Sequence, residues 1–259
     1  MPEMKRYKQG QFSWADLATS DEQGALKFYG ALFGWKDDPQ PMGPGSFYHM
    51  QQVKGRAACA INQQRPEEAA QGVPPHWNSY VTVDDVNSTA RLVPAAGGRV
   101  IGEPFDVFDS GRMAVITDST GAFLSLWQPK RHIGAGIYDE TGTLTWFELL
   151  TTDLDKAVVF YKSVLGVKSE KMPGPMEYSL LKVDGKNVAG VFRITKEMGP
   201  VPPSWTVYFR VENCDAASQK AQSLGATVLM PPHEIPNVGR FAVLKDPQGA
   251  VFNIYQHKH

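Results

Sequence analysis

The chain has 259 residues, of which 42% are hydrophobic and 20% charged, the balance of an ordinary globular protein. At roughly 100–200 residues per domain, this length predicts two domains. Lys and Arg number 26 against 27 Asp and Glu, and the net charge of −1 argues against nucleic acid or an anionic membrane as a partner. The two cysteines, Cys59 and Cys214, are too few for a disulfide-rich scaffold or a multi-cysteine metal site. With no signal-peptide pattern and no run of about 18 apolar residues, we expect a cytoplasmic protein.

The first elements in the chain are a predicted strand and an amphipathic helix. The strand covers Phe12–Thr19, and Ser20 is the expected N-cap of the helix that follows. Apolar residues then recur at steps of three, one and three, the stripe of a helix with one buried face, and Gly34 is expected to end it. Two short alternating strands follow, over Ser46–Val53 and Arg56–Ile61.

A second group of elements completes the first half of the chain. It begins with a strand over Trp77–Val83 and a helix that Pro94 should end early. Two further strands are joined by the turn-forming sequence DSTG at Asp118–Gly121. The first half therefore contains two successive units of strand–helix–strand–strand–strand.

The second half repeats the pattern of the first. WADLATSDEQGALKFYGALFG from Trp14 aligns with WFELLTTDLDKAVVFYKSVLG from Trp146, and GRMAVITDSTGA aligns with GRFAVLKDPQGA. Asp16 corresponds to Glu148, which preserves the charge, and Thr152 takes the N-cap position. Ordered matches at nearly one offset indicate a tandem duplication. Residues 130–142, which carry glycine and charge without an apolar period, are predicted to link a first domain at 8–129 to a second at 143–257.

Four such units in two pairs resemble the vicinal-oxygen-chelate superfamily, which includes glyoxalase I, bleomycin-resistance proteins and extradiol dioxygenases. The resemblance rests on the D-x-x-x-A-x-x-F-Y-x-x-x-x-G helices at Asp21–Gly34 and Asp153–Gly166, and on the turns at Val115–Gly121 and Val243–Gly249. It covers nearly the whole chain. It implies an α+β fold in which four βαβββ modules form two curved eight-stranded mixed sheets, with helices packed outside and a ligand-binding cup inside each curve.

Alternation along the strands predicts which side chains line the two cups, because successive residues point to opposite faces. Leu17 and Leu149 are expected to face the helices, so Asp16 and Glu148 face the cups. Phe123 and Val251, at the starts of the last strands, are placed on the cup face. The side chains expected to contact a ligand are aromatic or polar: Trp14, Asn78, Tyr80, Ser125 and Trp127 in the first half, and Trp146, Thr206, Tyr208, Arg210, Asn253 and Tyr255 in the second.

The resemblance also implies positions for metal ligands, and these carry poor donors in this sequence. Metal-dependent members of the family use His, Glu or Gln, the donor types that suit a divalent ion. We therefore expect no metal cofactor, and the alternative is one divalent ion displaced toward His76 and Asp16. The implied positions fall on Trp14 and Trp146, on Asn78 and Thr206, on Ser125 and Asn253, and on the strands Ala57–Ile61 and Val188–Phe192, which contain no His, Glu or Asp.

Two carboxylates remain as candidate catalytic groups. Asp16 and Glu148 lie among aromatic residues, where poor solvation would raise their pKa and suit them to general acid or base catalysis. The structural alternative is that hydrogen bonds satisfy both carboxylates, for example a contact of Glu148 with Arg210. Arg112 and Arg240 are expected to be solvated or to form an ion pair between the domains, in preference to binding an anion at the cup rim.

Three functions are compatible with these residues. The first is metal-free binding of an amphipathic or aromatic small molecule in one or both cups, as in bleomycin-resistance proteins. The second is a lyase, isomerase, hydroxylase or dioxygenase that uses a displaced metal or acid–base chemistry by Asp16 and Glu148. The third is a structural or partner-binding protein with filled cups. The sequence leaves the identity of the ligand open, and the protein is expected to be a monomer or a homodimer.

Overall fold

The computed structural model describes residues 3–174 and 176–258. The chain forms strands and helices in the predicted order, module by module. The helices are α1 (Glu22–Phe33), α2 (Pro66–Ala70), α3 (Val86–Leu92), α4 (Leu154–Leu165) and α5 (Cys214–Ser223), with a 3₁₀ turn at Lys196–Met198. The strands of the first half are β1 (Phe12–Thr19), β2 (Lys36–Gly43), β3 (Ser46–Val53), β4 (Arg56–Gln63), β5 (His76–Thr82), β6 (Arg99–Val100), β7 (Phe105–Val107), β8 (Gly111–Thr117) and β9 (Phe123–Pro129). Those of the second half are β10 (Leu144–Thr151), β11 (Lys168–Lys171), β12 (Tyr178–Val183), β13 (Lys186–Arg193), β14 (Ser204–Arg210), β15 (Thr227–Ile235), β16 (Gly239–Lys245) and β17 (Val251–His257).

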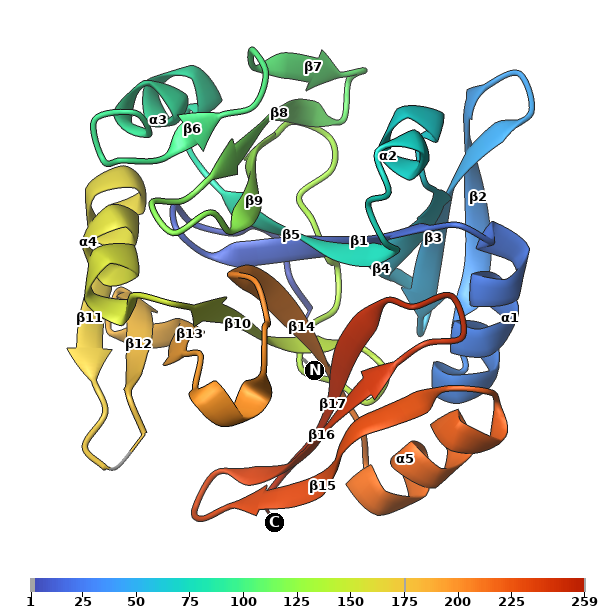
Figure 1. The fold of residues 1–259 in the computed structure, drawn as a ribbon. Coiled ribbons are helices and arrows are strands. Elements are labelled where there is room, and N and C mark those ends of the chain that lie inside the picture. Colours follow the sequence, from blue (N-terminus) through green and yellow to red (C-terminus); the bar gives the residue numbers. More distant parts are fainter. Residues whose placement is uncertain (1–2, 175, 259) are drawn as a thin grey trace.

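Each half of the chain builds one mixed β-sheet (Figure 1). The first sheet runs β2-β3-β4-β1-β5-β9-β8-β6, and the second runs β11-β12-β13-β10-β14-β17-β16-β15, the same order of corresponding strands. In both sheets the two modules meet through antiparallel first strands, β1 with β5 and β10 with β14. The first sheet has nine strands where eight were predicted, because the short strand β7 also pairs with β8. The α+β fold with four βαβββ modules is thereby confirmed.

The helix ends confirm the glycine signals and correct the predicted N-caps. Gly34 ends α1 in the left-handed conformation, with φ 74°, and α3 ends at Leu92, shortly before Pro94. The N-caps predicted at Ser20 and Thr152 are wrong, since Asp21 and Asp153 occupy these positions. The Asp21 carboxylate accepts a hydrogen bond from the backbone N–H of the third residue along, and Asp153 does the same. A carboxylate also favours the positive end of the helix dipole, so the aspartates make the better caps.

The two sheets share one hydrophobic core, which lies between them together with the helices. Phe12 of β1 stacks on Phe147 of β10 with ring centroids 4.9 Å apart, so the first strands of the two halves meet in this core. Leu17 and Leu149 are fully buried there, as predicted. Helix α1 packs beside α5 and α3 beside α4, so each pair joins helices from different halves (Figure 1). The faces turned away from this core are the first cup, on the first sheet, and the second cup, on the second.

The sequence motif of the helices and turns joins the two halves by reciprocal hydrogen bonds. The Tyr29 hydroxyl of α1 donates to the Asp246 carboxylate in the last turn of the second half, at 2.9 Å. The Tyr161 hydroxyl of α4 donates to Asp118 in the last turn of the first half, at 2.8 Å. All four side chains are buried. The residues that carried the family resemblance therefore stabilise the fold and lie outside the cups.

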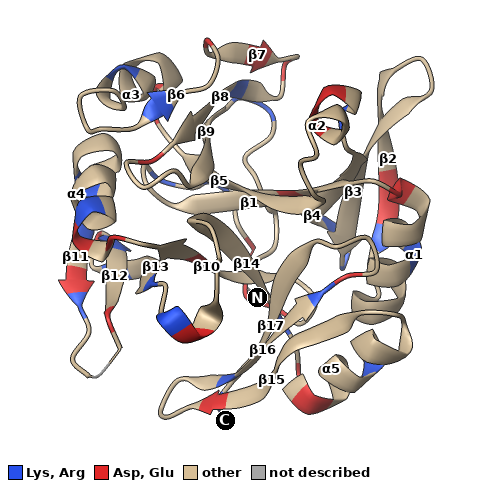
Figure 2. Cartoon of the chain, viewed as in Figure 1, with Lys and Arg blue, Asp and Glu red and all other residues tan. Residues whose placement is uncertain are grey.

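Charged residues of both signs are spread over the helices, strands and loops (Figure 2). Arg112 pairs with Asp106, at 3.4 Å, and Arg240 makes a bidentate pair with Asp215, at 2.8 Å. Both pairs lie within one half of the chain, so the ion pair expected between the halves is wrong for these arginines. Each arginine pairs with an aspartate of its own module. In the described part of the chain, no helix is long and apolar enough to cross a membrane.

Candidate functional site: two cups with a buried carboxylate

The first cup is built around Asp16, which is only 4% exposed. Its Oδ2 accepts hydrogen bonds from the hydroxyls of Tyr80, at 2.7 Å, and Tyr48, at 2.9 Å. Its Oδ1 accepts one from the Asn78 amide, also at 2.9 Å, and the Trp14 indole donates to the Tyr48 hydroxyl at 2.8 Å. Burial raises the pKa of the Asp16 carboxyl, and these hydrogen bonds offset part of the rise. The carboxylate is thus held by three close donors.

The second cup repeats this cluster around Glu148. The Tyr208 hydroxyl donates to its Oε2 at 2.7 Å, and the Tyr178 hydroxyl also faces the carboxylate. The Trp146 indole donates to the Tyr178 hydroxyl at 3.3 Å. Burial raises the pKa of Glu148, as it does that of Asp16, but the Glu148 and Trp146 side chains remain half-buried where their counterparts are buried. Each cup therefore holds a carboxylate, two tyrosines and a tryptophan, and the second is the more open.

Strand register explains why these side chains converge. Asp16 lies opposite Asn78 and Trp14 opposite Tyr80 in the β1–β5 pair. The β10–β14 pair sets Glu148 opposite Thr206 and Trp146 opposite Tyr208 in the same way. The alternation that predicted these cup residues thus holds in the structure.

Tyr48 and Tyr178 belong to the clusters and are absent from the predicted set. They lie on β3, where a strand was predicted without assigning a face, and on β12, its counterpart in the second half. The sequence contains a signal for them, because the two tyrosines correspond when the repeats are aligned. In addition, Tyr48 and the buried His49 are adjacent on one strand, so their side chains point to opposite faces of the sheet. The repeat comparison could therefore have identified them.

The last strands place the remaining predicted residues around the clusters. Asn253 of β17 donates to the Thr206 hydroxyl at 2.7 Å, which turns both side chains toward each other. Ser125 of β9 lies beside Tyr80 in the parallel β5–β9 pair. Phe123 and Val251 are 59% and 41% exposed, so they stand at the rim.

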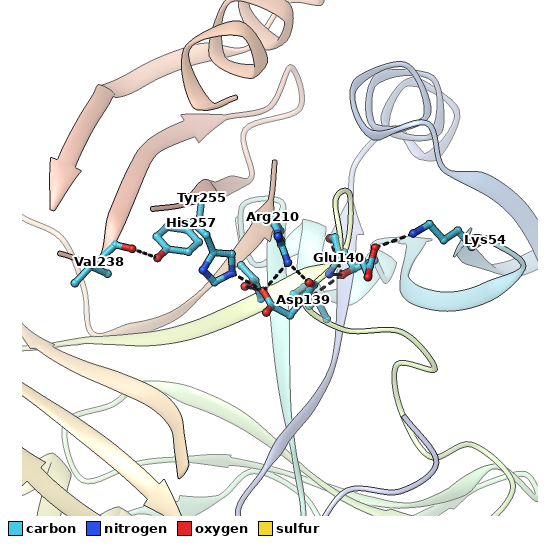
Figure 3. A network of polar contacts seen from close by, with 10 residues as sticks. Lys54, Asp139, Glu140, Arg210, Val238, Tyr255 and His257 are labelled. Atoms are coloured by element: carbon cyan, nitrogen blue, oxygen red, sulfur yellow. Dashed lines mark hydrogen bonds and ion pairs between the residues drawn. The ribbon is translucent and has the colours of Figure 1, made fainter. Parts of the chain in front are cut away.

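Arg210 does not contact Glu148, and the hydrogen bond suggested between them is wrong. Its guanidinium donates to the backbone carbonyl of Asp139 and lies 3.7 Å from the carboxylate of the same residue (Figure 3). The His257 ring contacts the Asp139 carboxylate at 2.7 Å. Arg210 stands at the end of β14, so it reaches the linker, whereas Glu148 in mid-strand reaches Tyr208.

The same linker segment is tied to the first half of the chain. Glu140 pairs with Lys54 of the β3–β4 turn at 2.7 Å, next to the contacts of Asp139 (Figure 3). Tyr255, predicted to line the second cup, donates its hydroxyl to the Val238 carbonyl at 2.8 Å. A shallow hollow of about 370 Å³ adjoins this network, lined by Thr141, Arg210, Val211, Glu212, Gln256 and His257. Of the residues predicted for the second cup, Arg210 lines this hollow, whereas Glu148 and Tyr208 do not.

At two of the metal positions implied by the family, one in each half of the chain, the side chain cannot hold a divalent ion. Trp14 and Trp146 use their indoles as hydrogen-bond donors, and an indole nitrogen does not ligate metals. At the alternative site, the Asp16 oxygens already accept three hydrogen bonds, and His76 directs Nδ1 to the Pro74 carbonyl at 2.8 Å. Within residues 3–174 and 176–258, no three His, Cys, Asp or Glu side chains are grouped so that they could hold a metal ion.

Comparison with known proteins gives the chain relatives of nearly its full length. The protein named "Putative glyoxylase CFP32" from Mycobacterium bovis is 45% identical over 257 residues, which cover 98% of this chain and 97% of that protein. The "Anthracycline biosynthesis protein DauV" from Streptomyces sp. (strain C5) is 32% identical over 271 residues, with 98% and 95% covered.

Solved structures share the fold at low sequence identity. The Mn(II)-bound glyoxalase from Novosphingobium aromaticivorans superposes with a TM-score of 0.66 at 14% identity, over 95% of this chain and 82% of that chain. The 2,2',3-trihydroxybiphenyl 1,2-dioxygenase from Sphingomonas wittichii strain RW1 gives 0.67 at 14% identity, over 95% and 90%. Residues 11–126 and 143–254 each match the same family profile. The chain therefore belongs to the glyoxalase/bleomycin resistance protein/dioxygenase superfamily, as two successive copies of its fold.

Proposed function

We propose that this protein binds an amphipathic or aromatic small molecule in a metal-free cup, in one or both halves of the chain. The observation that carries the proposal is the Trp–Tyr–carboxylate–Tyr cluster, which both cups retain although the two halves differ at most other positions. Buried carboxylates are costly, so a fold that only needed to close its core would gain from an apolar replacement. Aromatic rings offer a surface on which a planar ligand can stack. The carboxylate would fix the orientation of that ligand by accepting a hydrogen bond from it.

The names of the relatives suggest a first probe. Because one relative is named for anthracycline biosynthesis, a planar hydroxylated aromatic such as 1,8-dihydroxyanthraquinone is a suitable ligand to titrate. Binding is measured as saturable quenching of tryptophan fluorescence. We expect Glu148→Gln to weaken the affinity about tenfold or more, because the amide offers a poorer hydrogen-bond acceptor than the carboxylate. The control is Glu103→Gln, which changes an exposed carboxylate on a loop. If Glu148→Gln binds with the affinity of the wild type, the second cup is not the binding site.

Metal content is a separate measurement. The donor set described above favours a site that works without an ion, so we expect protein purified without chelator to contain less than about 0.1 equivalent of zinc, nickel, iron or manganese. A stoichiometric ion that is lost in Asp16→Asn would contradict the metal-free part of the proposal and support the displaced site near His76.

Acid–base catalysis is a second candidate, favoured by one observation. Burial raises the pKa of Glu148, while the residue is half-buried where Asp16 is buried, and a carboxyl in that state can exchange a proton with a bound molecule. If turnover of a bound compound is found, Glu148→Gln should abolish it while Asp16→Asn, in the more enclosed cup, should leave a measurable rate. Equal rates in the wild type and Glu148→Gln would exclude this role.

A further inference from the structure

The linker between the two halves crosses the face of the first cup. Its Ala135 N–H donates to the Ser13 carbonyl of β1 at 2.7 Å, and the Gly136 N–H donates to the Ala57 carbonyl of β4 at 2.8 Å. The Tyr7 hydroxyl donates to the Ala135 carbonyl at 2.8 Å and holds the linker from its outer side. Ala135 is fully buried and packs in one cluster with Trp14, on the cup side of the sheet. The linker is therefore part of the wall of this cup.

The linker residue His132 lies against two tryptophans of the first cup, Trp14 and Trp127. Its ring centroid is 4.6 Å from that of Trp14 and 5.9 Å from that of Trp127, and both contacts are edge-to-face. The Trp127 indole donates to the His132 carbonyl at 2.9 Å, which fixes the residue in place. The His132 Nε2 is buried without a hydrogen-bond partner among the described residues. The imidazole is thus held by aromatic contact, as a bound planar ligand would be.

The corresponding tryptophan and aromatic residue of the second cup are less covered. Trp14 and Trp127 are 3% and 4% exposed, whereas Trp146 and Tyr255 are half-buried. In this cup the linker makes its contacts at the end of the sheet, through Asp139 (Figure 3). The two cups share a cluster and differ in what covers it.

We propose that the first cup is an aromatic site occupied by the chain's own His132, an internal ligand, so that the second cup alone accepts a molecule from solution. That His132 occupies the first cup is inferred from contacts within the chain, whereas ligand binding in the second cup rests on the proposed function. Removal of the imidazole should leave a space that a free planar heterocycle can refill.

The experiment replaces His132 by glycine and titrates imidazole into the purified full-length variant. We expect saturable tryptophan quenching in the millimolar range, and a melting temperature raised by about 3 °C at ten times the dissociation constant. The wild type and His233→Gly, which removes an imidazole from an exposed edge strand, should show neither change. His132→Ala leaves a similar space with less backbone freedom and serves if the glycine variant does not fold.

Two outcomes separate this inference from the proposed function. If imidazole has no effect on either folded His132 variant, the internal-ligand assignment is overturned. The stoichiometry of 1,8-dihydroxyanthraquinone provides the second test, with one site expected in the wild type. Two sites in the wild type would also overturn the assignment. A wild type that binds no anthraquinone, with imidazole still refilling the variant, would refute the proposed function and leave the internal ligand supported.

Discussion

The first and second cups began as copies and now differ in three respects. The Asp16 carboxylate has three close donors, while Glu148, one methylene longer, has one close donor and is half-buried. Ala60 lies beside Asp16 on the neighbouring strand, where Gly190 lies beside Glu148. The first cup is also covered by the linker. The comparison shows that the same cluster is closed and fully hydrogen-bonded in one half and more exposed in the other, and the proposed use of the second cup rests on this difference.

The largest expected effect follows from the number of donors on each carboxylate. Asp16→Ala would leave the hydroxyls of Tyr48 and Tyr80 and the Asn78 amide without their acceptor, and buried unpaired donors are destabilising. We expect a loss of about 3 kcal/mol in the free energy of unfolding, against about 1 kcal/mol for Glu148→Ala. Urea denaturation measures both. Equal losses would show that the first cup is no more closed than the second.

A pH dependence should arise from the imidazole in the first cup. Burial lowers the pKa of His132 to about 4, below the ordinary value of about 6.5 in an unfolded chain. Between these values the unfolded state binds more protons, so stability present above about pH 6.5 is lost as the pH falls. At pH 5 the loss from this residue should be about 2 kcal/mol.

The measurement compares the wild type with His132→Phe, which keeps a planar ring without a titrating group. The free energy of unfolding is determined at pH 7 and pH 5 for both proteins. Other carboxyls with a raised pKa, such as Asp16 and Asp246, contribute equally to the two, so the difference isolates His132. Parallel losses in the two proteins would mean that His132 is protonated in the folded state.

The reciprocal tyrosine–aspartate hydrogen bonds should contribute equally to the free energy of unfolding, because both halves retain them. Tyr29→Phe and Tyr161→Phe each remove a buried hydroxyl that donates to an aspartate of the other half and accepts a hydrogen bond from a tryptophan indole, that of Trp77 or Trp205. We expect each variant to lose about 1.5 kcal/mol of unfolding free energy, with the two losses within about 0.5 kcal/mol of each other. A difference above about 1 kcal/mol would show that the shared core depends more on one half.

Much of this arrangement follows from local patterns in the sequence. Alternation about Leu17 and Leu149 placed Trp14, Asp16 and Glu148 correctly, because burial on one face of a strand fixes the other face. The helix and turn motifs identified the fold through Tyr29 and its equivalent, which pack in the core.

Other features depend on contacts between distant residues, which no local pattern encodes. The linker composition predicts a loop, but its route over the first cup depends on the hydrogen bond from Tyr7, which is 128 residues away from Ala135. Arg210 could reach either Glu148 or the linker, and only the folded path of Asp139 decides between them. The internal-ligand position of His132 was therefore beyond prediction, although a buried imidazole beside two tryptophans is plain once the fold is known.

The smallest expected effect on stability tests why the second cup stayed open. A Cβ on Gly190 would lie 1.9 Å from the Tyr178 hydroxyl and 3.2 Å from the Trp146 indole nitrogen, so Tyr178 must move. Because the ring is half-buried and can turn toward solvent, Gly190→Ala should cost only about 1 kcal/mol in unfolding free energy. It should nevertheless weaken anthraquinone binding about tenfold by separating Tyr178 from Glu148. The matched variant Ala60→Gly, made at the equivalent position of the first cup, should leave that affinity unchanged. If both variants bind as the wild type does, the tyrosine beside Glu148 has no part in ligand binding, and the openness of the second cup must come from the route of the linker alone.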